Sequence, residues 1–154
     1  MNKIIIFLLM ITFFHGCGYK PQFGKNQKID FYIASIEFEN NDKQLEQFIK
    51  SNINNYRKKN NGDEIKIKTY INYQKKPISK NVSGKVEEYE LTASIDFKAE
   101  INDQIKELNV NEKFNMSNFE DEFDERNFER NIKRNMSRSI TSKLIIWLTR
   151  LNDS

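Results

Sequence analysis

The sequence predicts an α+β domain in which two helices pack on one face of a roughly four-stranded β-sheet, in the order β-α-β-β-β-α. Residues 88–101 alternate apolar and polar side chains without a break, which is typical of a half-buried strand. Apolar residues recur at helical spacing over 45–56 and again over 128–151. Because both helical stripes and one sheet face must be buried, two packed layers are the simplest arrangement.

The first expected strand covers Ile29–Phe38, where apolar residues tend to occupy alternate positions. The alternation slips at Ala34–Ser35, and such a slip predicts a β-bulge. The apolar period then changes to that of a helix, which we expect within Asn40–Asn61. The apolar face of this helix consists of Leu45, Phe48, Ile49, Ile53 and Tyr56.

The same helix has candidate signals at both ends. The side chain of Asn41 or Asp42 can accept a hydrogen bond from a backbone N–H of the first turn. The basic residues Arg57–Lys59 suit the partial negative charge of a helix C-terminus. Gly62 can end the helix because glycine readily adopts the left-handed conformation found there.

Three strands are expected next. Glu64–Gln74 alternates strictly, and Glu88–Ile101 is the clearest strand of the chain. Between them, Lys75–Lys85 contains proline and glycine and is expected to be a loop. Asn102-Asp103 predicts a tight turn into a weaker partner strand, whose apolar residues are Ile105, Leu108, Val110 and Phe114.

The last element is expected to be a long amphipathic helix. Acidic residues cluster over Glu120–Glu125, where carboxylates complement the partial positive charge of a helix N-terminus, an interpretation we prefer to metal binding. An apolar stripe then runs from Phe128 to Leu151. We expect the core of the domain to contain Ile95, Phe97, Ile67, Phe48, Ile53, Ile132, Ile140 and Leu144.

The N-terminus has the pattern of a lipoprotein signal peptide. Lys3 gives a positive start, Ile4–Phe14 is an apolar run, and Gly16 stands directly before Cys17. A cysteine in this position takes a diacylglyceryl group on its thiol, and the chain is cut before it. Two or three acyl chains hold a protein firmly in a membrane, whereas one chain alone binds marginally. We therefore expect lipidation at Cys17 and a place in the bacterial cell envelope.

Two other interpretations of this segment are possible. Ile4–Phe14 could be a transmembrane helix, but it falls well short of the roughly 20 residues that a span requires. Cys17 could be incidental to an ordinary cleaved signal, although a lone free thiol is a liability in an oxidising compartment. The chain is thus expected to divide into a signal peptide (1–16), a lipidated tether (17–28) and a single α+β domain (29–151).

Composition argues against several classes of function. The only histidine, His15, lies in the expected signal peptide, and the only cysteine is expected to carry lipid. Nucleophilic catalysis with a histidine base and zinc sites of His and Cys are then excluded. No glycine-rich phosphate loop occurs, and a net charge of +3 is too small to indicate a nucleic-acid-binding protein. We therefore expect that the chain is not an enzyme and binds neither a cofactor nor a metal ion. Hydrolysis by a pair of carboxylates is the remaining enzymatic alternative.

Three features occur together in this chain: the motif GCGYKP at Gly16–Pro21, the β-α-β-β-β-α order, and a C-terminal helix that ends near Leu148–Leu151. In these features the chain resembles the LPS-assembly lipoproteins of the LptE family. The resemblance implies a non-enzymatic domain that plugs a large outer-membrane β-barrel of the LptD type, the pair inserting lipopolysaccharide into the outer leaflet. It also implies a lipid-anchored location on the periplasmic side of the outer membrane. A generic envelope lipoprotein that binds another protein or a small ligand is the alternative.

Four lysines in the expected loop Lys75–Lys85 suggest a contact with lipopolysaccharide. The loop has no acidic residue and would project from one end of the sheet. Lysine is a competent point-charge partner for phosphate. The alternative is that these are ordinary solvated lysines in a lysine-rich chain. The residues concerned are Lys75, Lys76, Lys80 and Lys85.

Overall fold

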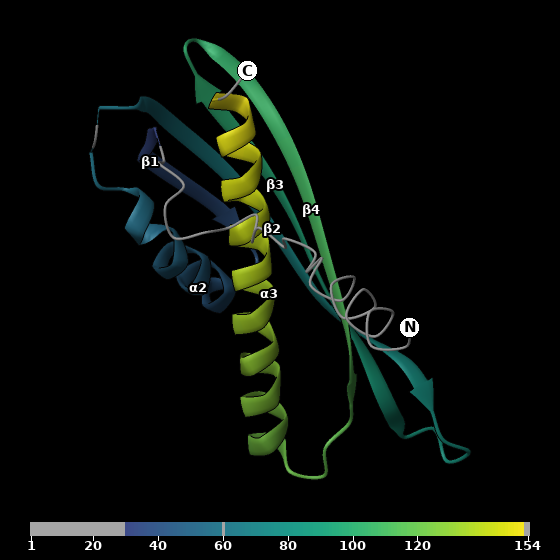
Figure 1. Cartoon of the computed structure of the whole chain (residues 1–154). Helices are drawn as coiled ribbons and strands as arrows, with labels where there is room; N and C mark the ends of the chain where they lie inside the picture. Colours follow the sequence, from purple (N-terminus) through teal and green to yellow (C-terminus); the bar gives the residue numbers. More distant parts are fainter. Residues whose placement is uncertain (1–29, 60, 153–154) are drawn as a thin grey trace, which may run out of the picture.

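The structure is a computed structural model that describes residues 30–59 and 61–152, so the expected signal peptide and tether, with Cys17, lie outside the described residues. Two helices lie on one face of a four-stranded sheet of order β1-β2-β3-β4 (Figure 1). The predicted fold class and element order are confirmed. The elements are β1 (Phe31–Asn40), α2 (Lys43–Ile53), the 3₁₀ turn η1 (Asn54–Tyr56), β2 (Asp63–Lys80), β3 (Val86–Ile101), β4 (Gln104–Ser117) and α3 (Glu122–Asn152).

Strand β1 pairs with β2 in parallel, whereas β2 with β3 and β3 with β4 pair antiparallel. The register of β1 shifts between Ile33 and Ser35, which confirms the predicted β-bulge. Two parallel neighbours need a crossover connection, and α2 supplies it. The crossover leaves α2 beside α3 on the same face of the sheet (Figure 1).

Helix α2 begins where the sequence predicts. Asp42 is its N-cap, because its Oδ1 accepts a hydrogen bond from the Leu45 N–H at 2.8 Å. Asn41 has a different role: its side-chain amide donates to the Tyr73 carbonyl at 2.9 Å and accepts from the Tyr73 N–H at 2.7 Å. The Asn41 side chain thus continues the row of hydrogen bonds between β1 and β2 beyond Asn40, where the backbone of β1 ends.

Gly62 does not end helix α2, which already ends at Ile53. The prediction of a glycine helix stop was therefore wrong. A Cβ at Gly62 would lie 1.9 Å from the carbonyl oxygen of Asp30. Because that oxygen belongs to the backbone, a side chain at Gly62 would push apart the chain segments that begin β1 and β2. Glycine is needed here for the close approach of two backbones.

The turn between β3 and β4 forms as predicted. Asn102 and Asp103 both have positive φ, at 48° and 60°, as a type I′ hairpin turn requires. The expected loop Lys75–Lys85 was wrong over its first part, because β2 continues to Lys80. Strands β2 and β3 form a second hairpin, and only the residues between Lys80 and Val86 form its connection. The tip of this β2–β3 hairpin projects beyond the helices (Figure 1).

Pro77 explains why the strand can continue. Pro77 pairs with Tyr89 of β3. Backbone groups along a strand point alternately to its two neighbours, and Tyr73, four residues earlier, points its N–H towards the side of β1. The nitrogen of Pro77 therefore faces the side on which β1 has already ended, and no hydrogen bond to β3 is lost. Proline is tolerated at such an edge position.

The acidic cluster lies at the N-terminus of helix α3, as predicted, and Asp121 in addition caps the helix. Oδ1 of Asp121 accepts hydrogen bonds from the N–H groups of Phe123 at 2.6 Å and Asp124 at 3.2 Å. The helix extends for 31 residues, about 46 Å at 1.5 Å per residue, along much of the sheet. Its buried stripe includes Ile132, Ile140 and Leu144, as predicted.

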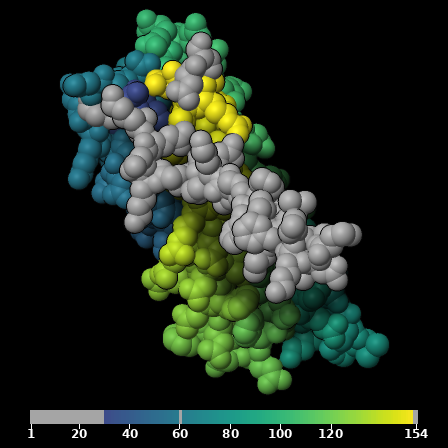
Figure 2. Space-filling view, in the orientation of Figure 1, coloured from purple at the N-terminus to yellow at the C-terminus, as the bar shows by residue number. Residues whose placement is uncertain are grey.

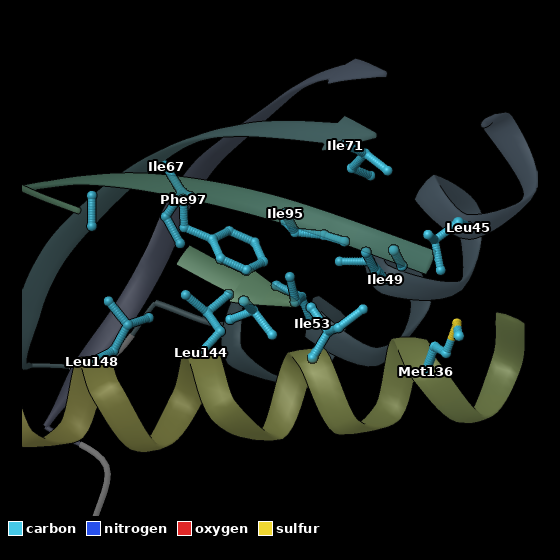
Figure 3. Close-up of a cluster of buried hydrophobic side chains, with 14 of the residues drawn as sticks. Leu45, Ile49, Ile53, Ile67, Ile71, Ile95, Phe97, Met136, Leu144 and Leu148 are labelled. Carbon is cyan, nitrogen blue, oxygen red and sulfur yellow. The ribbon is translucent and has the colours of Figure 1, made fainter. Parts of the chain in front are cut away.

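The core lies between the helices and the inner sheet face (Figure 3). Every predicted core residue is buried except Phe48, for which the prediction was wrong. Phe48 is half-buried, and its ring centroid lies 5.4 Å from the Arg134 guanidinium carbon. The face of α2 that meets the sheet is centred instead on the i, i+4, i+8 series Leu45, Ile49 and Ile53, all fully buried.

Candidate functional site

The four lysines singled out from the sequence do not lie on one loop. Lys75, Lys76 and Lys80 belong to strand β2, and Lys85 precedes β3. Lys76, Lys80 and Lys85 are exposed, whereas Lys75 is half-buried. The structure thus separates Lys75 from the other three, whose contact with lipopolysaccharide stays a prediction.

The connection after Lys80 is a tight turn held by backbone hydrogen bonds and by the side chain of Asn81. Oδ1 of Asn81 accepts hydrogen bonds from the Ser83 N–H at 3.0 Å and the Lys85 N–H at 2.9 Å. Gly84 supplies the left-handed φ of 82° that the turn requires. The tip forms a teal projection beside the yellow-green first half of α3 (Figure 2). Lys80 and Lys85 are therefore presented on an ordered hairpin.

Lys75 instead takes part in an ion-pair cluster between β2 and α3. Its Nζ lies 2.5 Å from Glu125 and 3.1 Å from Glu129, and 4.5 Å from the centroid of the Tyr89 ring. Burial opposes the charge on Lys75, but the hydrogen bonds to the two glutamates raise its pKa above the ordinary value. Through these two ion pairs Lys75 links strand β2 to the start of α3.

Lys133 extends this cluster to the start of α2. Its Nζ lies 2.6 Å from Oδ2 of Asp42 and 3.1 Å from Glu129, and 4.2 Å from the centroid of the Tyr73 ring. The Tyr73 hydroxyl donates to Glu129 at 2.9 Å. Asp42 therefore serves twice, as helix cap with one oxygen and as ion-pair partner with the other.

Two pKa shifts follow from this arrangement. Burial, then the charge and hydrogen bond of Glu129, raise the pKa of Tyr73 well above its ordinary range. Burial alone would raise the pKa of Glu129, but hydrogen bonds from Lys75 and Lys133 outweigh it and hold that pKa below the ordinary value. The glutamate is thus kept ionised by its partners, which suits a structural ion pair and not a proton donor.

The outer face of the sheet, away from the helices, carries a ladder of paired polar side chains. Ion pairs join Lys98 to Glu107 at 2.9 Å and Lys113 to Glu90 at 3.1 Å. Asn111 donates to the Ser94 hydroxyl at 3.2 Å. A depression of about 320 Å³ lies on this face, where Tyr70 and Ile105 flank lysine and glutamate side chains. The face is polar, as its alternating sequence predicts, with a few apolar groups set into it.

No catalytic or metal-binding constellation stands out in the part of the chain that the structure describes. Among residues 30–59 and 61–152, no three side chains of His, Cys, Asp or Glu are placed to hold a metal ion. The convergent carboxylates Glu125 and Glu129 both engage Lys75. Within the same residues, every helix is too short or too polar to cross a membrane.

Comparison with solved structures shows where this fold occurs. Rare lipoprotein B from Shewanella oneidensis matches with a TM-score of 0.53 at 13% sequence identity, over 76% of this chain and 98% of that chain. The fold is that of rare lipoprotein B. An uncharacterized lipoprotein B from Nitrosomonas europaea matches with a TM-score of 0.57 at 11% identity, over 86% of this chain and 93% of that one. A minor lipoprotein from Acinetobacter baumannii matches with a TM-score of 0.55 at 13% identity, over 77% of this chain and 92% of that one.

The likeness to rare lipoprotein B is one of structure. No family model and no curated protein matches the sequence. The matched proteins are lipoproteins, and the likeness extends over most of this chain and nearly all of each matched chain.

Sequence reasoning missed two residues that organise the candidate site. Lys133 is assigned no role from the sequence, although this residue is only 8% exposed. Asn41 was considered as a helix cap and instead closes the end of β1. One signal was present for Lys133: it is four residues from Glu129, the spacing at which helical ion pairs form.

Proposed function

We propose that this chain is a lipid-anchored envelope protein, attached through Cys17, that plugs and helps assemble a large outer-membrane β-barrel of the LptD type. In this role it serves the insertion of lipopolysaccharide into the outer leaflet from the periplasmic side. The observation that carries the proposal is the likeness of the fold to rare lipoprotein B over most of both chains. The motif GCGYKP around Cys17 also supports it, because this motif is a feature of the sequence that precedes the first strand, β1.

The outer sheet face fits this role. The lumen of a large outer-membrane barrel is polar, so a plug needs a surface of satisfied polar groups. Lys98–Glu107 and Lys113–Glu90 provide neutralised charge pairs on that face.

Depletion of the protein in its native cells tests the proposal. We expect the amount of correctly assembled LptD-type barrel to fall, and the barrel to co-purify with the wild-type protein from solubilised outer membranes. A Cys17→Ser variant should remain an unprocessed precursor without acyl chains and should restore assembly poorly. Normal barrel assembly in depleted cells would contradict the proposal and favour the alternative of a generic envelope lipoprotein.

The exposed lysines near the hairpin tip are proposed to contact the phosphates of lipopolysaccharide. Each exposed charge contact contributes only about 0–1 kcal/mol, so Lys76, Lys80 and Lys85 are best replaced by Gln together. We expect the triple variant to bind purified lipopolysaccharide more weakly at low salt, and the difference to shrink as salt screens the charges. Lys66→Gln with Lys68→Gln, on the outer sheet face, is the control. Equal binding by the triple variant and wild type would mean that the tip is only a connector.

A further inference from the structure

Within residues 30–59 and 61–152, strand β4 leaves one edge of the sheet open. Its register with β3 runs from the Asn102-Asp103 turn to Ser117 without a shift. Residues of an antiparallel pair alternate between hydrogen-bonded and non-bonded positions, and the two-residue turn makes Gln104 the first bonded one. Odd-numbered residues from Ile105 to Asn115 therefore direct their backbone groups away from β3. Among the described residues, these groups have no backbone partner.

The opposite side of the sheet carries protective features that β4 lacks. Strand β1 has the β-bulge at Ile33/Ser35, and β2 beyond it has Pro77 and two register shifts. Bulges and proline are among the means by which proteins block pairing at an exposed edge. Strand β4 is 14 residues long with neither a bulge nor a proline.

A groove of about 330 Å³ lies on the helix side of β4, between this strand and the first half of α3. Its apolar lining comes from Phe114, Phe128, Ile132 and Met136. Towards the C-terminal half of α3 it is bounded by Glu112, which accepts from Ser139 at 2.6 Å. The charges at the groove are already paired: Glu112 with Lys143, and Lys113 with Glu90.

Aromatic side chains at this end of the molecule are left partly uncovered. Phe114 is 44% exposed and Phe128 40% exposed, with their ring centroids 6.4 Å apart. Phe119 adds a third ring, 5.2 Å from Phe128. Clustered exposed aromatic rings mark interaction surfaces more often than scattered ones do.

We propose that β4 and this groove together form a docking site for an extended segment of a partner protein, which adds to the sheet as a fifth strand. The open backbone groups would bind its main chain, and the groove would take its alternate side chains. These side chains are apolar, because the groove has an apolar lining and its charges are paired. The other side chains of the segment would lie beside the polar outer face.

The open edge distinguishes a strand from other occupants. A helix or an acyl chain could fill an apolar groove but would leave the backbone of β4 unpaired. A closed barrel has no free strand edge of its own, so the segment comes from a non-barrel part of a partner. The proposal therefore goes beyond the plug function and does not require it.

A defined peptide tests this docking site on the full-length protein reconstituted in lipid nanodiscs. The probe is a peptide of about ten residues in which valine alternates with threonine, flanked by lysines. Its matched control has the same sequence with the amide nitrogens on one edge methylated. We expect the probe to slow hydrogen exchange at Glu107, Asn109, Asn111 and Lys113, and the control peptide to bind about tenfold more weakly or worse.

Two variants make the test specific. Phe128→Ser removes a groove wall and is expected to weaken probe binding about tenfold, whereas Phe123→Ser, on the first turn of α3 outside the groove lining, should bind like wild type. Equal binding of the methylated and unmethylated peptides would overturn the proposal in favour of a purely apolar ligand. Exchange protection of β4 that rises with protein concentration alone would overturn it in favour of a second copy of this chain. No binding would also overturn it.

Discussion

Replacing Phe97 with alanine is expected to destabilise the domain by about 3–5 kcal/mol, the usual cost of truncating a buried phenylalanine. Phe97 is fully buried on the inner face of β3, and its ring points into the space between sheet and helices, near Leu144 (Figure 3). A small domain has only about 5–15 kcal/mol of stability. Equilibrium denaturation in urea, followed by circular dichroism, measures the change.

Phe123→Ala is the matched control, since it makes the same chemical change at a side chain that is 64% exposed. Exposed substitutions of this kind usually change stability by less than about 0.5 kcal/mol. A Phe97→Ala variant that unfolds at the same urea concentration as Phe123→Ala would show that the inner face of β3 has been assigned wrongly.

Lys133→Met is expected to destabilise the protein at neutral pH by somewhat less than the roughly 3–5 kcal/mol that breaking a fully buried ion pair costs. The lysine side chain is 10% exposed and its partners Asp42 and Glu129 are 14% and 17% exposed, so removing it leaves carboxylates poorly solvated without their cation. Lys143→Met is the control on the same helix, because Lys143 is 51% exposed in its pair with Glu112. Exposed pairs contribute about 0–1 kcal/mol. Similar losses for both variants would contradict a buried role for Lys133.

The pH dependence of this effect has a definite sign. The pKa of Glu129 in the folded protein is lowered, so its ionised form stabilises the fold at pH values above the ordinary glutamate pKa of about 4.3. That stabilisation is lost as the pH falls through the lower folded-state pKa. The difference between wild type and Lys133→Met should therefore be largest at neutral pH and shrink below about pH 4.3. Denaturation curves from neutral to acidic pH test this; a constant difference would exclude Glu129 as the group responsible.

Local patterns in the sequence were sufficient to predict the features that depend on neighbouring residues. The alternation in β3 identifies its buried face, the slip near Ser35 identifies the bulge, and Asn102-Asp103 identifies the hairpin turn. Each of these is set by side-chain direction or by backbone torsion within a few residues. The same holds for Asp42, whose capping bond reaches only to Leu45.

Only the tertiary structure decided the features that depend on which segment lies beside which. Pro77 ends a strand in most contexts, yet β2 passes through it because its nitrogen faces the side where β1 has ended. Lys75 looked like a solvated loop lysine until α3 placed Glu125 and Glu129 beside it. Gly62 is needed for a close backbone contact with Asp30, a residue that precedes it in the sequence by more than the length of α2. The open edge of β4 likewise follows from strand order, because local sequence sets the direction of a side chain but not what it meets.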